Sequence, residues 1–282
     1  MSSYRVRQGL QVPEVWGSGL VCLLTMRHDI VNSQDPFASV SGQYAASRPR
    51  YPRALFDWLA QIAPSRERAW DCACGSGQAT IDLADYFSHV IGTDKSADQL
   101  REANPDARIE YRVALAESSG LPSGHFDLVT VAQAMHWIDH DRFYAEVRRV
   151  LRPGGVLAVW CYGTGTIGIE KADAVFQDFY RNVVGPYWHS ERELVDSGYT
   201  NLDFPQPELT VPGFWMEQSW SQEELLGYVR SWSATARFVE AQNRDPVAEL
   251  GRRLRQYWGG SSARQTIRWP LSARVSLIDP YG

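Results

Sequence analysis

A glycine-spaced turn near residue 70 carries the residue types best suited to bind a ligand. Residues 70–77 read WDCACGSG, so that an acid in an apolar run leads into Gly75 and Gly77. Glycine lets the backbone approach a ligand where a Cβ atom would clash. A second acid, Asp94, follows Gly75 by 19 positions, close to the spacing of ~20 at which a carboxylate meets ribose hydroxyls in nucleotide-binding folds. Together these residues predict a site for an adenosine-containing ligand.

Two classes of adenosine ligand fit this spacing, and charge distinguishes them. A dinucleotide would place its pyrophosphate at the start of the helix after the turn, but the third glycine of that fingerprint falls at Thr80. Asp71, just before the turn, would oppose a pyrophosphate and favour a cationic ligand. S-adenosylmethionine carries a sulfonium and an ammonium group and no phosphate. The residues therefore favour S-adenosylmethionine. A dinucleotide-dependent oxidoreductase and a non-catalytic module that binds S-adenosylmethionine remain as alternative hypotheses.

Residues 136–141 form a second polar cluster. His136 and His140 are four positions apart, with Asp139 and Asp141 beside them. Trp137 stands where an H-E-x-x-H zinc motif has its general base, and no third ligand follows, so no metal is expected. His136 is a candidate general base with a pKa near neutrality, and a structural histidine bonded to the backbone is the alternative interpretation.

Alternating strand and helix patterns indicate how these residues are positioned. Apolar runs predict strands over 69–73, 90–93, 109–116, 126–132 and 156–161, and periodic patterns predict helices over 54–62, 78–87, 96–103 and 141–151. Short apolar strands between helices are typical of a doubly wound, mostly parallel α/β sheet covered on both faces. The ligand crevice of such a sheet lies at the carboxyl ends of its strands, which is where Tyr162 also falls.

Beyond residue 163 the sequence becomes rich in aromatic residues. Helices are expected over 171–184, 221–240 and 245–258, and strands over 213–220 and 266–277, with Pro270 interrupting the last one as an edge or bulge. Residues 176–232 are expected to form a cap whose tryptophans mostly fill its core, with Trp232 a candidate substrate contact. Arg230, Arg237 and Arg268 are candidates for binding an acidic substrate, because arginine binds carboxylates with two parallel hydrogen bonds.

Several segments together resemble the class I S-adenosylmethionine-dependent methyltransferases, most closely the branch of enzymes like trans-aconitate methyltransferase that act on small molecules. These segments are YAASRPRYP at 44–52, the turn at 71–77, Asp94, Ala116-Glu117, FDLVTVAQAMHW at 126–137 and RPGGVL at 152–157. The resemblance implies a Rossmann-like, seven-stranded sheet with an antiparallel last strand and a helical, aromatic-rich cap. Together with the sequence patterns, we expect a loose extension over 1–35, a leading helix over 36–65, a cofactor-binding core over 66–163, a cap over 164–240 and a closing helix and strand over 241–282.

The resemblance also assigns roles to individual residues. Asp71 and the backbone of Gly75 and Gly77 would hold the methionine end of S-adenosylmethionine, and Asp94 would hold the ribose. The remaining cofactor contacts would come from Lys95, Ala116 and Glu117 around the adenine, from Gln133 and Ala134 near the methyl group, and from Tyr44 and Arg48, which would close the site, with Tyr44 also a candidate catalytic residue.

Three further residues complete the expected site. His136 and Trp137 would lie at the substrate mouth, with Tyr162 nearby. The chain departs from the family pattern at Ala73, which replaces a common glycine, and at Leu115, where many relatives have an acid. The product of methyl transfer would be S-adenosylhomocysteine.

Composition and net charge indicate which classes of substrate and partner to expect. The chain has 282 residues, a formal net charge of −5 and four cysteines. An acidic chain has no overall field that attracts phosphate backbones, so a small-molecule substrate is expected and a nucleic acid is not. Four cysteines in this length are not a disulfide framework, and no stretch reaches the ~18 apolar residues of a membrane span. The protein is therefore expected to be cytoplasmic, with no membrane partner.

Overall fold

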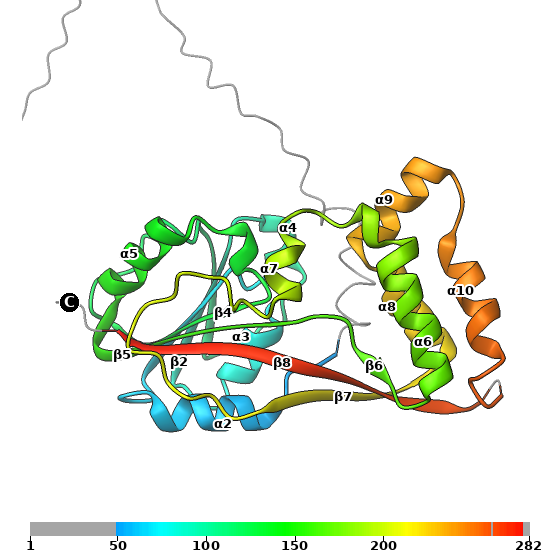
Figure 1. Cartoon of the computed structure of the whole chain (residues 1–282). Coiled ribbons are helices and arrows are strands. Elements are labelled where there is room, and N and C mark those ends of the chain that lie inside the picture. Colours follow the sequence, from blue (N-terminus) through cyan, green and yellow to red (C-terminus); the bar gives the residue numbers. More distant parts are fainter. Residues whose placement is uncertain (1–48, 261, 279–282) are drawn as a thin grey trace, which may run out of the picture. The chain divides into compact units, whose positions relative to one another are not determined.

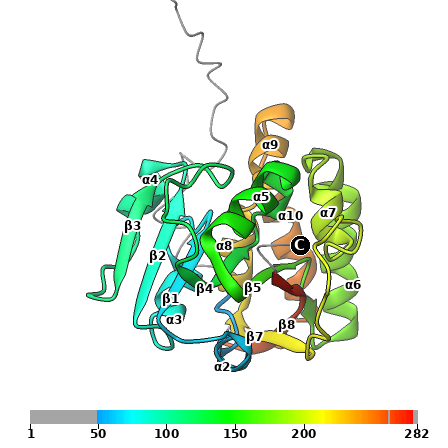
Figure 2. The ribbon, with the colours of Figure 1, turned by 90° about the vertical axis from the view of Figure 1, so that its left-hand side faces the viewer.

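A mixed sheet of eight strands forms the centre of the protein. The structure is a computed structural model that describes residues 49–260 and 262–278, which all fall within one compact unit. The strands are β1 (Arg68–Cys72), β2 (His89–Asp94), β3 (Ile109–Val113), β4 (Phe126–Ala132), β5 (Leu151–Tyr162), β6 (Thr166–Ile167), β7 (Phe214–Ser221) and β8 (Arg264–Ile278). Their order is β3-β2-β1-β4-β5-β8-β6, with β7 also paired to β8, and Figure 2 shows β3 to β8 side by side.

The first five strands are parallel, and β8 is antiparallel to β5. The predicted α/β class is therefore confirmed. The sheet has eight strands rather than seven because β6 and β7 both pair antiparallel with β8, which is 15 residues long and extends well past β5. Pro270 does not interrupt β8: it lies where the pairing passes from β7 to β5, so its missing N–H does not end the strand.

Helices cover both faces of the parallel strands. Figure 1 shows α2 (Arg53–Ile62) and α3 (Gln78–Leu83) on one side of the sheet, and α5 (His140–Val150) and α7 (Arg192–Asp196) on the other. The core divides in the same way. Leu55 and Phe56 pack with Leu128 and Trp160 in one apolar cluster, while Phe143 packs with other strand residues in a second cluster. Successive strand residues point to opposite faces, so β4 and β5 contribute to both clusters.

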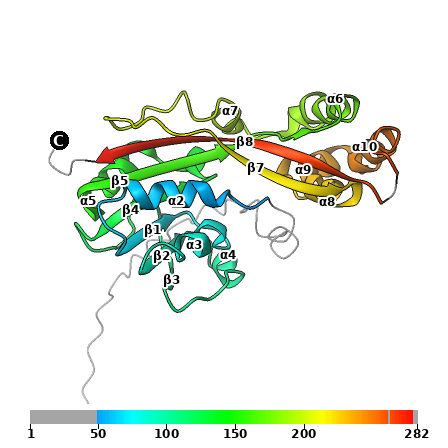
Figure 3. The ribbon, with the colours of Figure 1, turned by 90° about the horizontal axis from the view of Figure 1, so that it is seen from below.

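A helical layer packs against the outer half of β7 and β8. It contains α6 (Glu170–Asp178), α8 (Gln222–Arg230), α9 (Ser233–Gln242) and α10 (Pro246–Arg255). Figures 1 and 3 show these helices gathered at one end of the sheet. The short α4 (Ala97–Arg101) follows β2 on the opposite part of the molecule. The cap expected from the aromatic segment is thus a helical layer, and α10, from the last part of the chain, belongs to it.

Two predicted helices differ from the structure. Residues 221–240 form α8 and α9 rather than one helix, and the break lies at Ser231, whose hydroxyl donates to the Tyr228 carbonyl at 2.6 Å. Serine competes in this way with regular helical bonding. The Trp232 backbone is extended, and its side chain is buried in the core. The helix predicted over 171–184 ends at Asp178 and continues as a π-helical turn over Phe179–Val183.

Candidate active site

The turn between β1 and α3 has the backbone conformation that its glycines predict. Ala73, Gly75 and Gly77 have φ values of 52°, 55° and 78°, all in the left-handed region. Ala73 therefore adopts a conformation that favours glycine, at a steric cost that glycine would not have. At Gly77 a Cβ atom would collide with the Tyr111 hydroxyl. The turn thus requires glycine at 77 for both conformation and space.

Asp94 fixes this turn from the end of β2. One of its carboxylate oxygens accepts a hydrogen bond from the Gly75 amide at 2.8 Å, and the other accepts from the Ser96 amide at 2.8 Å. The side chain is only half-buried, and each carboxylate oxygen can accept more than one hydrogen bond. Asp94 can therefore order the glycine turn and still bind the hydroxyls of a ribose.

Asp71 lies below the turn and has no exposed surface. It accepts hydrogen bonds from Thr80 Oγ1 at 2.6 Å and from Thr130 Oγ1 at 2.7 Å. Burial raises the pKa of Asp71 to about 6, although both hydroxyls act to lower it. The structure thus places Asp71 enclosed beneath the turn, and its contact with the methionine end of a cofactor stays a prediction.

Two other predicted cofactor residues serve to join loops. Glu117 Oε1 accepts a hydrogen bond from the Asp139 amide at 2.9 Å, linking the loop after β3 to the start of α5. The Gln133 side chain donates to the Tyr162 carbonyl at 3.0 Å and accepts from the Tyr162 amide at 2.8 Å. Gln133 has φ 56°. Its amide therefore bridges the ends of β4 and β5, and its contact with the methionine group stays a prediction.

Most of the residues near the expected position of the adenine are apolar. Lys95 is exposed, whereas Ala116 and Ala134 are buried. Val113 and Leu115 expose more than half of their side-chain surface, 61% and 54%. Leu115 therefore offers an apolar surface where many family members have an acid. Tyr44 and Arg48 lie outside the described residues.

A cavity opens beside the ends of β4 and β5. Its volume of about 80 Å³ is several times the ~10–15 Å³ that one water molecule needs. Cys72 at the end of β1 is level with Val131 of β4, so the glycine turn and the cavity wall at Gln133 leave adjacent strands at the same height. The lining comprises Gln133, His136, Trp137, Tyr162, Gly163, Thr164, Trp188, His189, Arg192, Tyr228, Trp232 and Ser233.

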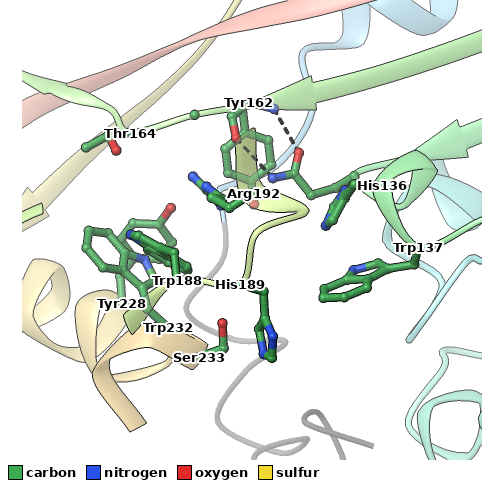
Figure 4. Close-up of a pocket in the computed structure, with 12 residues that line it drawn as sticks. His136, Trp137, Tyr162, Thr164, Trp188, His189, Arg192, Tyr228, Trp232 and Ser233 are labelled. Atoms are coloured by element: carbon green, nitrogen blue, oxygen red, sulfur yellow. Dashed lines mark hydrogen bonds between the residues drawn. The ribbon is translucent and has the colours of Figure 1, made fainter. Parts of the chain in front are cut away.

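Aromatic rings form much of this wall, and Figure 4 shows Trp188, Tyr228 and Trp232 on one side of the cavity with His136 and Trp137 on the other. Trp188 and Trp232 have ring centroids 5.7 Å apart, and Trp137 contacts His189 edge to face at 5.6 Å. The structure therefore brings the predicted His136, Trp137, Tyr162 and Trp232 to one cavity. Trp220 instead belongs to the buried core.

His136 is largely buried and does not have the near-neutral pKa that its candidate role requires. Burial, with a contribution from the Arg192 charge, lowers the pKa of His136 to about 4. The ring Nδ1 lies 3.1 Å from the Tyr199 hydroxyl, which is within hydrogen-bond distance. His136 is thus a weak base whose ring is held against Tyr199.

Arg192 lines the cavity and was not revealed by sequence patterns. It begins α7, a helix of five residues that is too short for a periodic pattern. The arginines predicted for an acidic substrate lie elsewhere: Arg230 pairs with Asp245, Arg237 donates to the Tyr187 carbonyl, and Arg268 pairs with Glu217. His189 and Tyr228 were also missed, since nothing local distinguishes them from other residues of the helical layer.

The described residues contain no group of three or more side chains suited to hold a metal ion. His136 lies in a 3₁₀ turn (Met135–Trp137), while His140 begins α5 and its Nε2 contacts the Met135 carbonyl at 2.9 Å. The two histidines therefore do not share a helix face.

Among the residues that the structure describes, Cys72, Cys74 and Cys161 are free thiols. No helix in this part of the chain is both long and apolar enough to cross a bilayer.

Comparison with known proteins agrees with this geometry. A family model described as a methyltransferase domain matches residues 70–159. A Dictyostelium discoideum protein called "Putative methyltransferase" is 37% identical over 219 residues, covering 77% of this chain and 83% of its own length. A yeast protein called "Probable S-adenosylmethionine-dependent methyltransferase CRG1" is 33% identical over 131 residues, covering 43% of this chain and 45% of its own.

A solved structure is similar over a larger part of the chain. It is described as a type II methyltransferase, assigned as "Putative", from Anaeromyxobacter dehalogenans. It has 44% sequence identity and a TM-score of 0.79, and the match covers 83% of this chain and 99% of that one. A match over this share of the chain extends well beyond residues 70–159, which the family model covers.

Proposed function

Because the chain belongs to the class I S-adenosylmethionine-dependent methyltransferases, we propose that it transfers a methyl group to a small molecule bound in the aromatic cavity. The observation that carries this proposal is the position of that cavity, whose wall begins at Gln133, level with the glycine turn on the adjacent strand. A ligand on the turn and an acceptor in the cavity would be neighbours.

S-adenosylmethionine would supply an electrophilic methyl group on a sulfonium. In this arrangement Asp94 and the turn at Gly75 would hold the nucleoside, and Leu115 would offer apolar surface to the base. Asp71 would contribute its buried charge below the cationic end. Aligning two bound reactants can lower a barrier by ~7–11 kcal/mol, so positioning by these residues is sufficient to explain a large rate increase.

His136 is not expected to act as a general base in the methyl transfer. A side chain whose pKa is about 4 is a poor proton acceptor near neutral pH, where the most effective general base has a pKa close to the working pH. We infer that His136 helps to orient the acceptor rather than to remove its proton. The reaction then favours acceptors that are already ionised and need no base.

The dimensions and charge of the site support a small acceptor. A cavity of about 80 Å³ with tryptophan walls suits a compact group with a flat apolar body. A chain with a net charge of −5 has no overall attraction for nucleic acid. We further propose that the enzyme works in the cytoplasm.

Calorimetric titration of the full chain with S-adenosylmethionine and S-adenosylhomocysteine tests the proposal. Asp94→Ala should weaken both affinities about tenfold to a hundredfold, because it removes a charged hydrogen-bond acceptor. Asp98→Ala, a change at an exposed carboxylate in α4, is the matched control and should change neither. If a folded wild-type sample binds neither ligand, the proposal fails.

Two further outcomes would assign a different function. Binding of NADH in a fluorescence titration, without binding of S-adenosylmethionine, would favour an oxidoreductase. Binding of S-adenosylmethionine with no methyl transfer to any member of a broad acceptor panel would favour a non-catalytic binding module.

A further inference from the structure

The cavity contains a guanidinium group whose hydrogen-bonding capacity is only partly used. Arg192 Nε donates to the Tyr180 hydroxyl at 3.1 Å and to Asp196 Oδ1 at 3.2 Å. Its carbon Cζ lies 4.5 Å from the centre of the Trp188 ring. Within residues 49–260 and 262–278, these contacts account for its hydrogen bonds, and none leaves the two Nη groups. Figure 4 shows this side chain between the tryptophan side of the cavity and His136.

Arg274 shows what an arginine with a purely structural role looks like in the same protein. Its Nε and Nη2 bind the two oxygens of Glu208 at 3.1 and 2.6 Å. Its Nη1 donates to the Tyr199 and Leu202 carbonyls at 3.0 and 2.7 Å. Every nitrogen of Arg274 has a partner, whereas Arg192 is anchored at Nε alone. The anchored end holds the Arg192 side chain in place and leaves four N–H donors for a ligand.

A second group in the same wall lacks a partner. Trp188 Nε1 is buried and has no hydrogen-bond partner in the part of the chain that the structure describes. An indole N–H can only donate, and a buried donor left without an acceptor is costly. A ligand that supplies an acceptor atom would therefore remove that cost.

The charges around the cavity select among ligands. Among the lining residues that the structure describes, none is acidic and Arg192 is the one arginine or lysine. A cationic amine would meet the guanidinium and no carboxylate in the wall. Asp196, which binds Arg192 from outside the lining, offsets part of its charge, which favours a ligand with a single negative charge over a dianion. A planar carboxylate matches the planar guanidinium in shape as well as charge.

We propose that the acceptor is a monocarboxylate on a flat apolar body, and that Arg192 is the residue that determines this specificity. The proposal rests on the methyl transfer proposed above. The carboxylate would accept hydrogen bonds from the Arg192 Nη groups, and the apolar body would lie against Trp188 and Trp232.

Pairs of ligands that differ only in charge provide the first test, without using a variant. Wild-type full chain saturated with S-adenosylhomocysteine is titrated calorimetrically with phenylacetate, trans-cinnamate and indole-3-acetate, each beside its primary amide. At least one acid should bind about tenfold or more tightly than its amide, since hydrogen bonds to charged groups are the stronger ones. Equal binding of acid and amide in every pair, tighter binding of phenethylamine, or no binding of any acid would overturn the proposal.

Variants then assign the discrimination to Arg192. Arg192→Gln should lose the preference for the acid while keeping its affinity for S-adenosylhomocysteine, which also reports that the variant is folded. Arg192→Lys keeps the charge without the fork of two nitrogens and should restore part of the preference. Arg237→Gln, at an exposed arginine whose hydrogen bond goes to the Tyr187 carbonyl, is the matched control and should behave as wild type.

The outcomes separate this inference from the function on which it rests. If the wild type binds S-adenosylhomocysteine but no acid, the carboxylate proposal fails and methyl transfer stands. If the wild type does not bind S-adenosylhomocysteine, the proposed function itself fails. If Arg192→Gln keeps the full preference for the acid, Arg192 is not the specificity residue.

Discussion

Two aspartates with no exposed surface lie at opposite ends of the same parallel strands, and their surroundings differ. Asp127, at the start of β4, binds Arg152 at 3.0 Å and also accepts from the Ser65 hydroxyl and the amides of Glu67 and Arg68. Its charge is thus compensated by a cation and three hydrogen bonds.

Asp71, near the end of β1, has two threonine hydroxyls as partners and forms no ion pair with the residues that the structure describes. Burial consequently raises the pKa of Asp71 to about 6. Within this part of the chain, the charge of Asp127 is therefore compensated by a cation, whereas the charge of Asp71 below the glycine turn is not. An uncompensated buried charge is costly, and the proposed cationic cofactor gives it a use.

The largest change in the free energy of unfolding is expected when Asp127 is replaced. Asp127→Ala would leave Arg152, the Ser65 hydroxyl and two backbone amides without their acceptor. Removing one partner of a buried pair costs about 3–5 kcal/mol, so the free energy of unfolding in urea should fall by that amount. Affinity for S-adenosylhomocysteine at low temperature should stay unchanged. A loss below about 1 kcal/mol would show that Asp127 behaves as a surface charge and would remove the contrast with Asp71.

Replacing Asp71, near the glycine turn, should instead raise the free energy of unfolding. Asp71→Asn should raise the free energy of unfolding at pH 7.5 by up to about 3 kcal/mol, the cost of ionising a carboxyl whose pKa is raised by burial. The pKa of Asp71 rises from 3.8 when unfolded to about 6 when folded, so the folded state binds more protons between these values. Wild-type stability from this group therefore falls as the pH rises from about 4 to about 6.

Urea unfolding at pH 4, 5, 6 and 7.5 measures this difference. The gap between Asp71→Asn and wild type should widen across that range and then level off. A constant gap would mean that Asp71 titrates alike in the folded and unfolded states.

A smaller decrease in the free energy of unfolding is expected when Gln133, between the ends of β4 and β5, is replaced. Gln133→Leu removes the two hydrogen bonds to the Tyr162 backbone and should lower the free energy of unfolding by about 1–3 kcal/mol. Gln133→Glu keeps an acceptor for the Tyr162 amide and should lose less. If both variants lose the same amount, the bridge to the Tyr162 amide contributes nothing to stability.

The smallest change in the free energy of unfolding is expected when Ala73, in the glycine turn, is replaced. Ala73→Gly relieves a left-handed alanine, worth ~1–2 kcal/mol, but increases the flexibility of the unfolded chain by ~0.4–1 kcal/mol. We expect a net gain of less than about 1 kcal/mol in thermal or urea unfolding. Ala54→Gly, on the exposed side of α2, is the control and should lose about 1 kcal/mol. A loss at Ala73 as well would mean that this turn does not strain its alanine.

The sequence by itself determined the strand-turn-helix unit around Gly75 and Gly77, and the place of Asp94 at the next strand end. These features depend on local rules: glycine at left-handed positions, apolar runs of strand length, and a fixed spacing between neighbouring strands. The capping box of Ser221 and Glu224 was predictable for the same reason, and it is present. Family resemblance then supplied the cofactor expected at this turn.

Only the tertiary structure decided which side chains share the cavity. Arg192 lies 59 positions beyond Gln133 in the sequence, yet both line one wall. Their meeting depends on how α7 and the helical layer pack on the sheet, which no local pattern encodes. The same holds for the enclosure of Asp71 and the low pKa of His136, because burial depends on neighbours from distant segments, and burial sets the charge state of both groups.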